Sequence, residues 1–281
     1  MAVSSPYANE ARKQVGRYLV EQAGYSKKTA QNFYKHGHDI LTRVYLHRSR
    51  GITQLYVGIV PLYIPDSLDV LFATDVTMEL LPGCILLDDD SAFKAKAWAE
   101  KIITFLSSGI LVFMESISDH QALMNYLNDR AATDRRFVIS PIEAAQLIIF
   151  SSAYLGDVSS AIEYAKTAQQ KIKKERIDNL ASKLAQWDNK IADIRVEMAQ
   201  KTSKSANDFD SLITSYEREK RLAIFDAEHN APSTIQMYEK WIKPFAATNC
   251  NCEELFSQII DHNKMHLNYE KLFFSKMHTR K

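Results

Sequence analysis

Residues 30–65 alternate between apolar and polar side chains, and two short breaks rich in turn residues interrupt the alternation. A period of two residues is typical of half-buried strands, and the segment is also rich in β-branched and aromatic residues. The pattern therefore predicts three consecutive antiparallel strands, at about Gln31–Lys35, His38–His47 and Thr53–Leu62.

The same alternation assigns the side chains of the second strand to two faces. Ile40, Val44 and Leu46 are expected to face a helix that precedes the sheet, since a shift by one residue would turn them out of the core. Polar and aromatic side chains then share the opposite face and the turn that follows. This candidate partner surface consists of Arg43, Tyr45, His47, Arg48, Arg50 and Tyr56.

Helices are predicted before and after these strands. Apolar residues at spacings of three and four predict a first helix over Tyr7–Gln22, which should lie across one face of the sheet. Leu68–Leu81 fits both a fourth strand and a helix, and the strand is favoured. Helices are also predicted at Ala92–Leu106 and His120–Leu127. The aspartates and serine at residues 88–91 suit a helix N-terminus, where backbone N–H groups lack partners.

From Ser140 onward the pattern is helical throughout. Ser140 and Glu143 form a predicted capping box with Pro141 at the first helical position, and a helical hairpin follows over residues 140–168. A seam of apolar residues at alternating spacings of three and four comes next. It consists of Ile177, Leu180, Leu184, Trp187, Ile191, Ile194 and Met198.

A heptad seam of this length predicts either a coiled coil between two chains or a long helix packed against the return helix of the same chain. The internal hairpin is favoured, because Thr202–Asn207 has the composition of a short helix–helix connection. Pairing of the seam in a homodimer is the alternative.

Together these elements predict an α+β fold. An N-terminal helix lies on an antiparallel sheet of three or four strands, and an all-helical half with a long helix and helical hairpins follows. The change of pattern predicts two domains, an α+β domain over residues 1–135 and a helical domain over residues 136–281.

Composition and charge narrow the classes of protein. The chain of 281 residues has 46% hydrophobic and 25% charged residues and a formal net charge of +1, which gives no global attraction to nucleic acid or anionic membranes. Three cysteines are too few for a disulfide scaffold. The longest nearly uncharged run, residues 105–114, is shorter than the roughly 20 residues of a spanning helix, and no secretory signal precedes it. The expected location is cytoplasmic, without a membrane partner.

A succession of short motifs runs through the first half of the chain. After the leading helix come AGYSKK at residues 23–28, NFY at residues 32–34, and strand segments at residues 40–46 and 56–61. This succession resembles the bacterial family known as domain of unknown function 4304, over about residues 7–130. The resemblance implies the α+β fold, a bacterial intracellular setting and an interaction or immunity accessory role. It supplies no catalytic residues.

Motifs for catalysis, nucleotides or metals do not stand out in the sequence, which contains no GxSxG, GxGxxG or GxxxxGK[ST]. Three residue pairs have metal-ligand spacing but lack the further ligands that zinc requires nearby in the sequence. They are His36 and His38, His262 and His266, and Cys250 and Cys252. We expect no cofactor and no metal, and helix-capping roles for Asp88, Asp89 and Asp90.

The predicted function is that of a non-enzymatic protein that binds another macromolecule, in the first place a protein, through the helical half and the outward face of the sheet. The alternative is a nucleic-acid- or phosphate-handling enzyme centred on Arg43, His47 and Arg48, because aromatic side chains interleaved with basic ones can stack bases and hold phosphates. A plain solvated face is the ordinary explanation of the same pattern. A homodimer held by the heptad seam is a further hypothesis.

Overall fold

The computed structural model of the protein describes residues 5–37, 39–65, 72–75, 80–129, 140–200, 206–246 and 250–278. The chain folds into two compact units: unit 1 takes in residues 1–156 and 251–281, and unit 2 takes in residues 157–250. The predicted division at residues 135 and 136 differs from this one. The difference arises because the first and last helices of the predicted helical half pack within unit 1.

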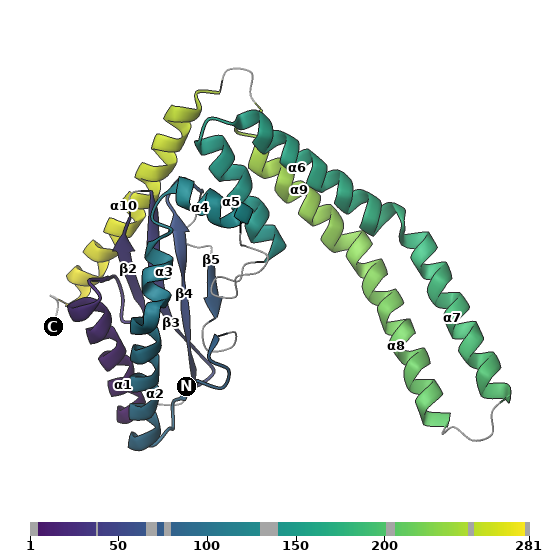
Figure 1. Ribbon diagram of the computed structural model, residues 1–281, viewed down its shortest axis with the longest axis horizontal. Coiled ribbons are helices and arrows are strands. Elements are labelled where there is room, and N and C mark those ends of the chain that lie inside the picture. Colours follow the sequence, from purple (N-terminus) through teal and green to yellow (C-terminus); the bar gives the residue numbers. More distant parts are fainter. Residues whose placement is uncertain are drawn as a thin grey trace. The chain divides into compact units, whose positions relative to one another are not determined.

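Unit 1 is built on an antiparallel sheet (Figure 1) in which the strands follow the order β1-β2-β3-β4-β5 and β6 also pairs with β4. The strands are β1 (Ser26–Lys27), β2 (Asn32–His36), β3 (Ile40–Ser49), β4 (Ile52–Pro61), β5 (Phe72–Asp75) and β6 (Leu86–Leu87). The predicted α+β fold is confirmed, and β5 is the fourth strand that the alternation predicted. Two strands of two residues each, β1 and β6, extend the sheet further.

Helices of unit 1 cover both faces of this sheet. They are α1 (Pro6–Arg17), α2 (Ala92–Phe105), α3 (Leu111–Glu115), α4 (His120–Asp129), α5 (Pro141–Tyr154) and α10 (Cys252–His278). The hydroxyl of Ser5 accepts a hydrogen bond from the N–H of Ala8 at 3.1 Å and so caps α1. A π-helical turn, Tyr18–Gln22, continues α1. The predicted capping box at Ser140 and Glu143 is present at the start of α5.

The inner face of the sheet is covered by α1 and α2, which lie side by side (Figure 1). Val44 of β3 pairs with Val57 of β4, and both are fully buried. Phe33 of β2 pairs with Val44 and packs against Gly16 of α1, where an added Cβ would lie 3.0 Å from the Phe33 ring. The predicted burial of Ile40, Val44 and Leu46 is confirmed. Small side chains on α1 let the helix lie close to the strands.

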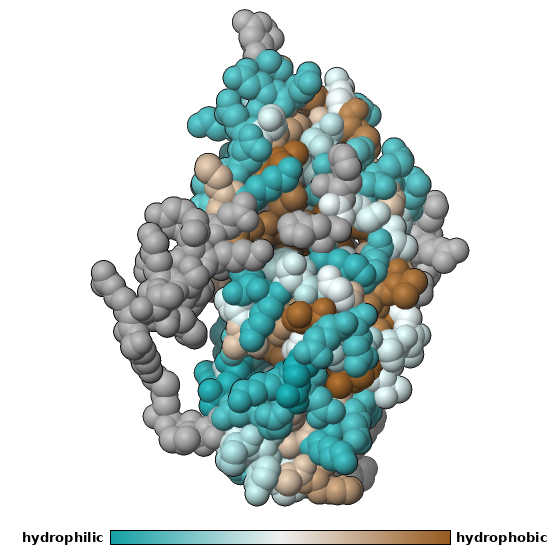
Figure 2. Space-filling model, turned by 90° about the vertical axis from the view of Figure 1, so that its left-hand side faces the viewer, coloured by the Kyte–Doolittle hydropathy of each residue, from teal (hydrophilic) through white to brown (hydrophobic). Residues whose placement is uncertain are grey.

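The outer face of the sheet is covered in part by α10. Tyr34, Leu41, Val60 and Leu62 form a buried cluster, and Ile260 and Leu267 of α10 pack against it. The buried Asn263 of α10 donates hydrogen bonds to the carbonyl oxygens of Leu62 at 2.8 Å and Ile64 at 2.9 Å. These bonds satisfy two backbone acceptors in the segment that leaves β4, so α10 belongs to the core of unit 1. The surface in Figure 2 is mostly hydrophilic, with several separate hydrophobic patches.

One helical segment of unit 1, Ala92–Glu115, is by length and composition apolar enough to cross a membrane, with a mean hydropathy of 1.4. The prediction counted only the uncharged run of residues 105–114. Buried side chains make up 39% of the same window, and the core helices of soluble proteins often have this composition. The helical backbone is interrupted at Gly109, whose φ is 120°.

The β3–β4 hairpin closes through a two-residue turn, Arg50 and Gly51, with φ values of 52° and 80°. Such a turn needs positive φ at both positions, which Gly and Asn adopt far more readily than Arg. We therefore expect Arg50→Asn to raise the free energy of unfolding by about 0.5 to 1 kcal/mol. Urea denaturation measures the change. Arg50→Val serves as the opposite control and should lower stability, and equal stability of the two variants would contradict the assignment of strain to this turn.

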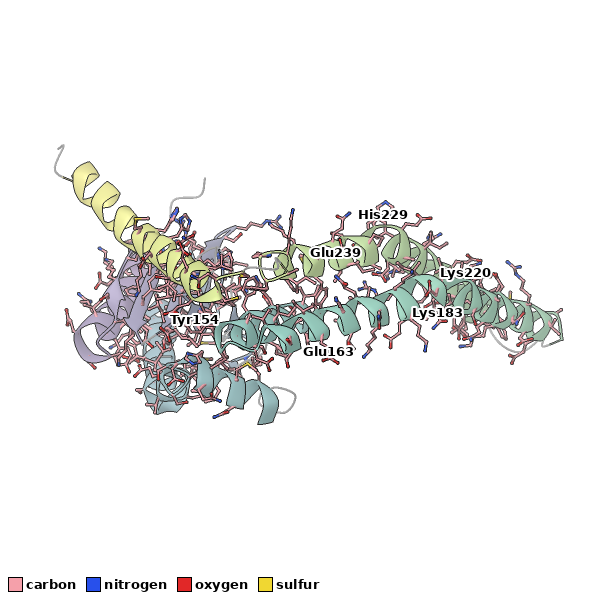
Figure 3. The ribbon with its side chains drawn as sticks, turned by 90° about the horizontal axis from the view of Figure 1, so that it is seen from above. Tyr154, Glu163, Lys183, Lys220, His229 and Glu239 are labelled. Atoms are coloured by element: carbon pink, nitrogen blue, oxygen red, sulfur yellow. The ribbon has the colours of Figure 1, made fainter. Side chains whose placement is uncertain are left out.

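Unit 2 is an antiparallel helical hairpin. One arm consists of α6 (Val158–Ile172), the π-helical segment Lys173–Asp178 and α7 (Leu180–Gln200); the other consists of α8 (Ala206–Phe225), the π-helical segment Asp226–Asn230 and α9 (Ala231–Ile242). α6 packs against α9 and α7 against α8, and Figure 3 shows Lys183 and Lys220 on the two arms. The predicted pairing of the long helix within the chain is therefore present in the structure.

Both arms of the hairpin bend where their π-helical segments lie beside each other (Figure 1). Arg176 donates from Nε to Oδ2 of Asp226 at 2.6 Å and from a terminal nitrogen to Oδ1, which joins the two segments. The Arg176 guanidinium lowers the pKa of the Asp226 carboxyl, and Asp226 raises the pKa of Arg176 in turn. A bidentate ion pair of this kind fixes the register of one arm of the hairpin against the other.

Candidate functional site

The outer face of the sheet brings together four residues of the predicted partner surface. Tyr45 of β3 lies opposite Tyr56 of β4 in the ladder, with ring centroids 6.2 Å apart. The hydroxyl of Tyr45 and Nδ1 of His47 are hydrogen-bonded at 3.0 Å, and the His47 ring meets the Tyr56 ring edge-on at 6.0 Å. Arg43 lies next to them, with its guanidinium 5.0 Å from the Tyr45 ring centroid. These side chains form one half-buried cluster.

Arg43 is held in place by its neighbours. Its guanidinium donates two hydrogen bonds to Oδ1 of Asn32, at 3.1 Å and 2.9 Å, and also lies 5.7 Å from the Tyr34 ring centroid. These cation–π contacts and the hydrogen bonds to the side-chain amide of Asn32 restrict the Arg43 side chain to one position. The surface is therefore a preformed, mildly basic aromatic face.

The two other residues predicted for this surface do not belong to the cluster, although Arg50 lies in the turn as predicted. Arg48 was expected in the turn after the second strand, and this expectation was wrong. β3 continues to Ser49, so the alternation places Arg48 on the inner face with Leu46. The Arg48 guanidinium contacts Asp88 there, at 2.6 Å to Oδ2. Arg50 is exposed in the turn, where its backbone has a positive φ of 52°.

Asp88 lies at the centre of a charged network on the inner face. Its side chain is 8% exposed and accepts from Arg12 at 3.1 Å and from Arg48 at 3.0 Å and 2.6 Å. Arg12 also donates to Oγ1 of Thr53 at 2.9 Å. The backbone of Asp88 accepts from the N–H of Ser5 at 2.7 Å and donates to the carbonyl of Gly51 at 2.8 Å. The predicted capping role of Asp88 is wrong, because its carboxylate binds the two arginines. Ser91, which the same prediction included, caps α2.

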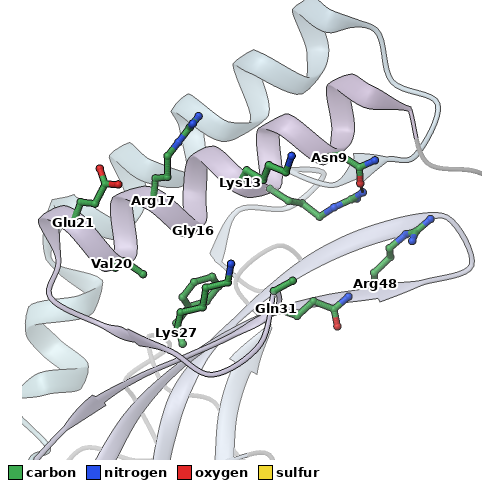
Figure 4. Close-up of a pocket in the computed structure, with 12 residues that line it drawn as sticks. Asn9, Lys13, Gly16, Arg17, Val20, Glu21, Lys27, Gln31 and Arg48 are labelled. Atoms are coloured by element: carbon green, nitrogen blue, oxygen red, sulfur yellow. Dashed lines mark hydrogen bonds between the residues drawn. The ribbon is translucent and has the colours of Figure 1, made fainter. Parts of the chain in front are cut away.

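This network forms one end of a cleft of about 750 Å³ between α1 and the strands (Figure 4). α1 and the π-helical turn after it supply one wall, and β1, β2 and the end of β3 supply the other. The lining residues are Asn9, Arg12, Lys13, Gly16, Arg17, Val20, Glu21, Lys27, Ala30, Gln31, Phe33 and Arg48. Five of these residues are basic and one is acidic, although the whole chain carries a net charge of only +1.

The cleft has a recognisable origin in the sequence. Positions 9, 12, 13, 16, 17 and 20 recur at intervals of three and four and therefore share one side of α1, next to the buried face. In the sequence, the basic residues at 12, 13 and 17 beside a glycine at 16 were the pattern from which this wall of the cleft could have been predicted. The facing wall could not be found in the same way, because its residues come from three strands and the connection between two of them.

A second crevice, of about 630 Å³, lies between the end of α5 and the beginning of α10. His120 and Tyr154 are part of its lining, and Asp39 lies behind them, 8% exposed. Nδ1 of His120 is 3.3 Å from Oδ2 of Asp39. The His120 ring meets the Tyr154 ring edge-on at 5.0 Å, and Tyr154 is stacked on Tyr63 at 4.5 Å.

The environment of this crevice changes the acidity of Tyr154. Burial raises the pKa of its hydroxyl, and the Asp39 carboxylate raises it further through its charge and a hydrogen bond. An imidazole oriented by a carboxylate is a component of general acid–base sites, and ordinary buried ion pairs have the same geometry. A reaction would also need a nucleophile or a bound substrate at hydrogen-bond distance. The crevice therefore does not by itself define an active site.

The residue pairs with metal-ligand spacing remain pairs. Within the part of the chain that the structure describes, no group of three or more His, Cys, Asp and Glu side chains could hold a metal ion. The rings of His262 and His266 are 4.6 Å apart on α10. His38 lies outside the described residues, and the strand predicted to begin there is described from Ile40.

Comparisons of the chain with models of protein families, with curated proteins and with solved structures found no match. The resemblance to domain of unknown function 4304 stays a prediction. Function is therefore argued below from the geometry alone.

Proposed function

We propose that the protein is a non-enzymatic interaction protein, and that its helical hairpin binds helices of another protein chain. The observation that carries the proposal is the apolar surface of α8. Leu212, Leu222 and Phe225 are 49%, 51% and 53% exposed, and Val196 of α7 is 56% exposed. Leu222 and Phe225 lie on one side of α8 and Leu212 lies further round the helix, and exposed large apolar side chains on a helix favour contact with another helix.

The burial pattern of α7 and α8 supports the same function. Two antiparallel helices can bury only the sides that face each other, and of the described side chains of α7 and α8, Ile191 and Phe209 are buried. The remaining residues of the heptad seam are half-buried in this pairing. Further helices, as in a four-helix bundle, would cover the rest.

We further propose that the occupant of this face is a second copy of the hairpin. The beginning of α8 is acidic, with Asp208 and Asp210, whereas residues 217–221 (EREKR) of its later part carry a net charge of +1. In a dimer whose twofold axis is perpendicular to α8, the two copies of this helix are antiparallel, so the acidic beginning of each α8 would lie near the later part of the other. The homodimer proposed here uses the exposed side of α8, while the heptad seam stays within the chain.

The test is a measurement of molar mass. The full-length protein should be a dimer by light scattering coupled to size exclusion, and Leu222→Asp combined with Phe225→Asp should make it a monomer, because two charges would have to be buried. Phe93→Asp is the matched control, since Phe93 is 82% exposed on α2 of unit 1. This control should leave the dimer intact.

Two results would contradict the proposal: a wild-type monomer at all concentrations, or a dimer that survives the double substitution.

The alternative function, an enzyme that handles nucleic acid or phosphate on the sheet face, has less support. Arg48 contacts Asp88 on the other side of the sheet, and Arg43 and His47 are engaged with Asn32 and Tyr45. The three side chains that could have met phosphates together are thus either on different faces of the sheet or engaged with other residues.

A further inference from the structure

The cleft between α1 and β1–β2 has the size and lining of a small-molecule site. Its volume of about 750 Å³ lies within the range of about 300 to 1,000 Å³ that is usual for such sites. Its floor is apolar, with the edge of the Phe33 ring against Gly16, and Val20 is 41% exposed at one end. An apolar floor under polar walls suits a ligand that has an apolar part and a polar part.

The positive charges of the cleft are distributed unevenly. Arg12 and Arg48 share the single carboxylate of Asp88 at one end, and Lys13 follows Arg12 on α1. Glu21 lies at the opposite end, near Val20. Two guanidinium groups on one carboxylate form a cationic group as a whole, so this end of the cleft attracts anions.

Several donors in the cleft are available for a ligand. Lys13 and Lys27 are exposed, and neither forms an ion pair with any residue that the structure describes. They project from opposite walls, one from α1 and one from β1 (Figure 4). The side-chain amide of Gln31 likewise makes no hydrogen bond to the described part of the chain. Arg17 also lines the cleft, but its guanidinium forms an ion pair at 2.6 Å with Glu10, which is not a lining residue.

We propose that this cleft binds an organic phosphate of about the size of a nucleoside monophosphate. The phosphate lies between Lys13 and Lys27, which reach the cleft from its two walls (Figure 4), and the cationic group of Arg12, Arg48 and Asp88 at one end adds to the positive potential. The apolar part lies against Val20, which is 41% exposed whereas Phe33 beneath is 1% exposed, and Gln31 can hydrogen-bond a polar group of the ligand. Guanidinium and ammonium groups are the usual phosphate partners in proteins. This site is in unit 1 and is independent of the proposed dimer face on α8.

Isothermal titration calorimetry of the full-length protein with adenosine 5′-monophosphate tests the site. Saturable binding is expected, with weaker binding of adenosine and of inorganic phosphate, because each of these lacks one half of the ligand. Lys13→Gln combined with Lys27→Gln should weaken binding by about tenfold or more, the equivalent of one charged hydrogen bond. The affinity should also fall as salt is added.

The matched control is Lys94→Gln combined with Lys96→Gln. These lysines lie on α2, are 71% and 73% exposed and are absent from the cleft lining, so the change of net charge is the same. The control should bind like wild type. The proposal is overturned if the nucleotide gives no saturable binding, if both double variants weaken binding equally, or if adenosine binds as tightly as its phosphate. Tighter binding of single-stranded RNA through the same lysines would also overturn it, in favour of a polymer ligand.

Discussion

A variant that lacks residues 157–250, with Gly156 joined to Asn251 by a short glycine–serine linker, should fold as unit 1 alone. Unit 2 is inserted between the two segments of unit 1. Its deletion should therefore leave the core of unit 1 intact. Gly156 and Cys252 line the same crevice, so the two ends of the insertion are close enough for a short linker. Circular dichroism and a cooperative thermal transition would measure the expected fold.

The contrasting truncation ends at residue 135, the predicted domain boundary. It removes α5 and α10, and with α10 the cover of Tyr34, Leu41, Val60 and Leu62. Exposure of four buried side chains at about 1.5 to 3 kcal/mol each is comparable to the whole stability of a domain, about 5 to 15 kcal/mol. This variant should be unfolded or aggregated. A cooperative transition for it, or none for the first variant, would contradict the division into units.

Substitution of Asp88 by alanine should be the most destabilising single change in unit 1. The expected loss is about 3 to 5 kcal/mol, the range for removing one partner of a buried ion pair. Without the carboxylate, the guanidinium of Arg12, only 11% exposed, loses its anion, and Arg48 loses its partner. Urea denaturation monitored by tryptophan fluorescence measures the free energy of unfolding.

Asp89→Ala is the matched control for Asp88→Ala, since Asp89 is exposed and adjacent. Its effect should stay within about 0.5 kcal/mol. A second variant, Arg12→Met combined with Asp88→Leu, should recover part of the loss, because it removes both buried charges. A loss below about 1 kcal/mol for Asp88→Ala would mean that this network contributes little to stability.

Much of the sheet could be predicted because the information is local. The alternation of β3 and the turn at Arg50 and Gly51 are contained in a few neighbouring residues, and they set the faces of Val44 and Tyr45 correctly. Arg48 was misplaced because the strand was ended two residues too early. Whether a residue near the end of a strand still points to one face of the sheet depends on where strand pairing stops. Sequence patterns locate the ends of helices and strands poorly.

The clefts could not be predicted because their residues are far apart in the sequence. Arg12 and Asp88 are separated by 76 positions, and His120 and Asp39 by 81. Asp88 also precedes a helix, where an aspartate usually has a capping role, and tertiary contacts overrode this preference. The return of α10 to unit 1 after the inserted hairpin left no local pattern at all.

The two π-helical segments of the hairpin also constrain how unit 2 can change over evolution. Each such segment arises from an extra residue in a helix, and one residue turns everything beyond it by about 100°. The segments Lys173–Asp178 and Asp226–Asn230 face each other, joined by Arg176 and Asp226, so the rotation in one arm is matched in the other. Loss of the extra residue from one arm alone would put its apolar side out of phase. Insertions and deletions here should therefore be inherited in pairs.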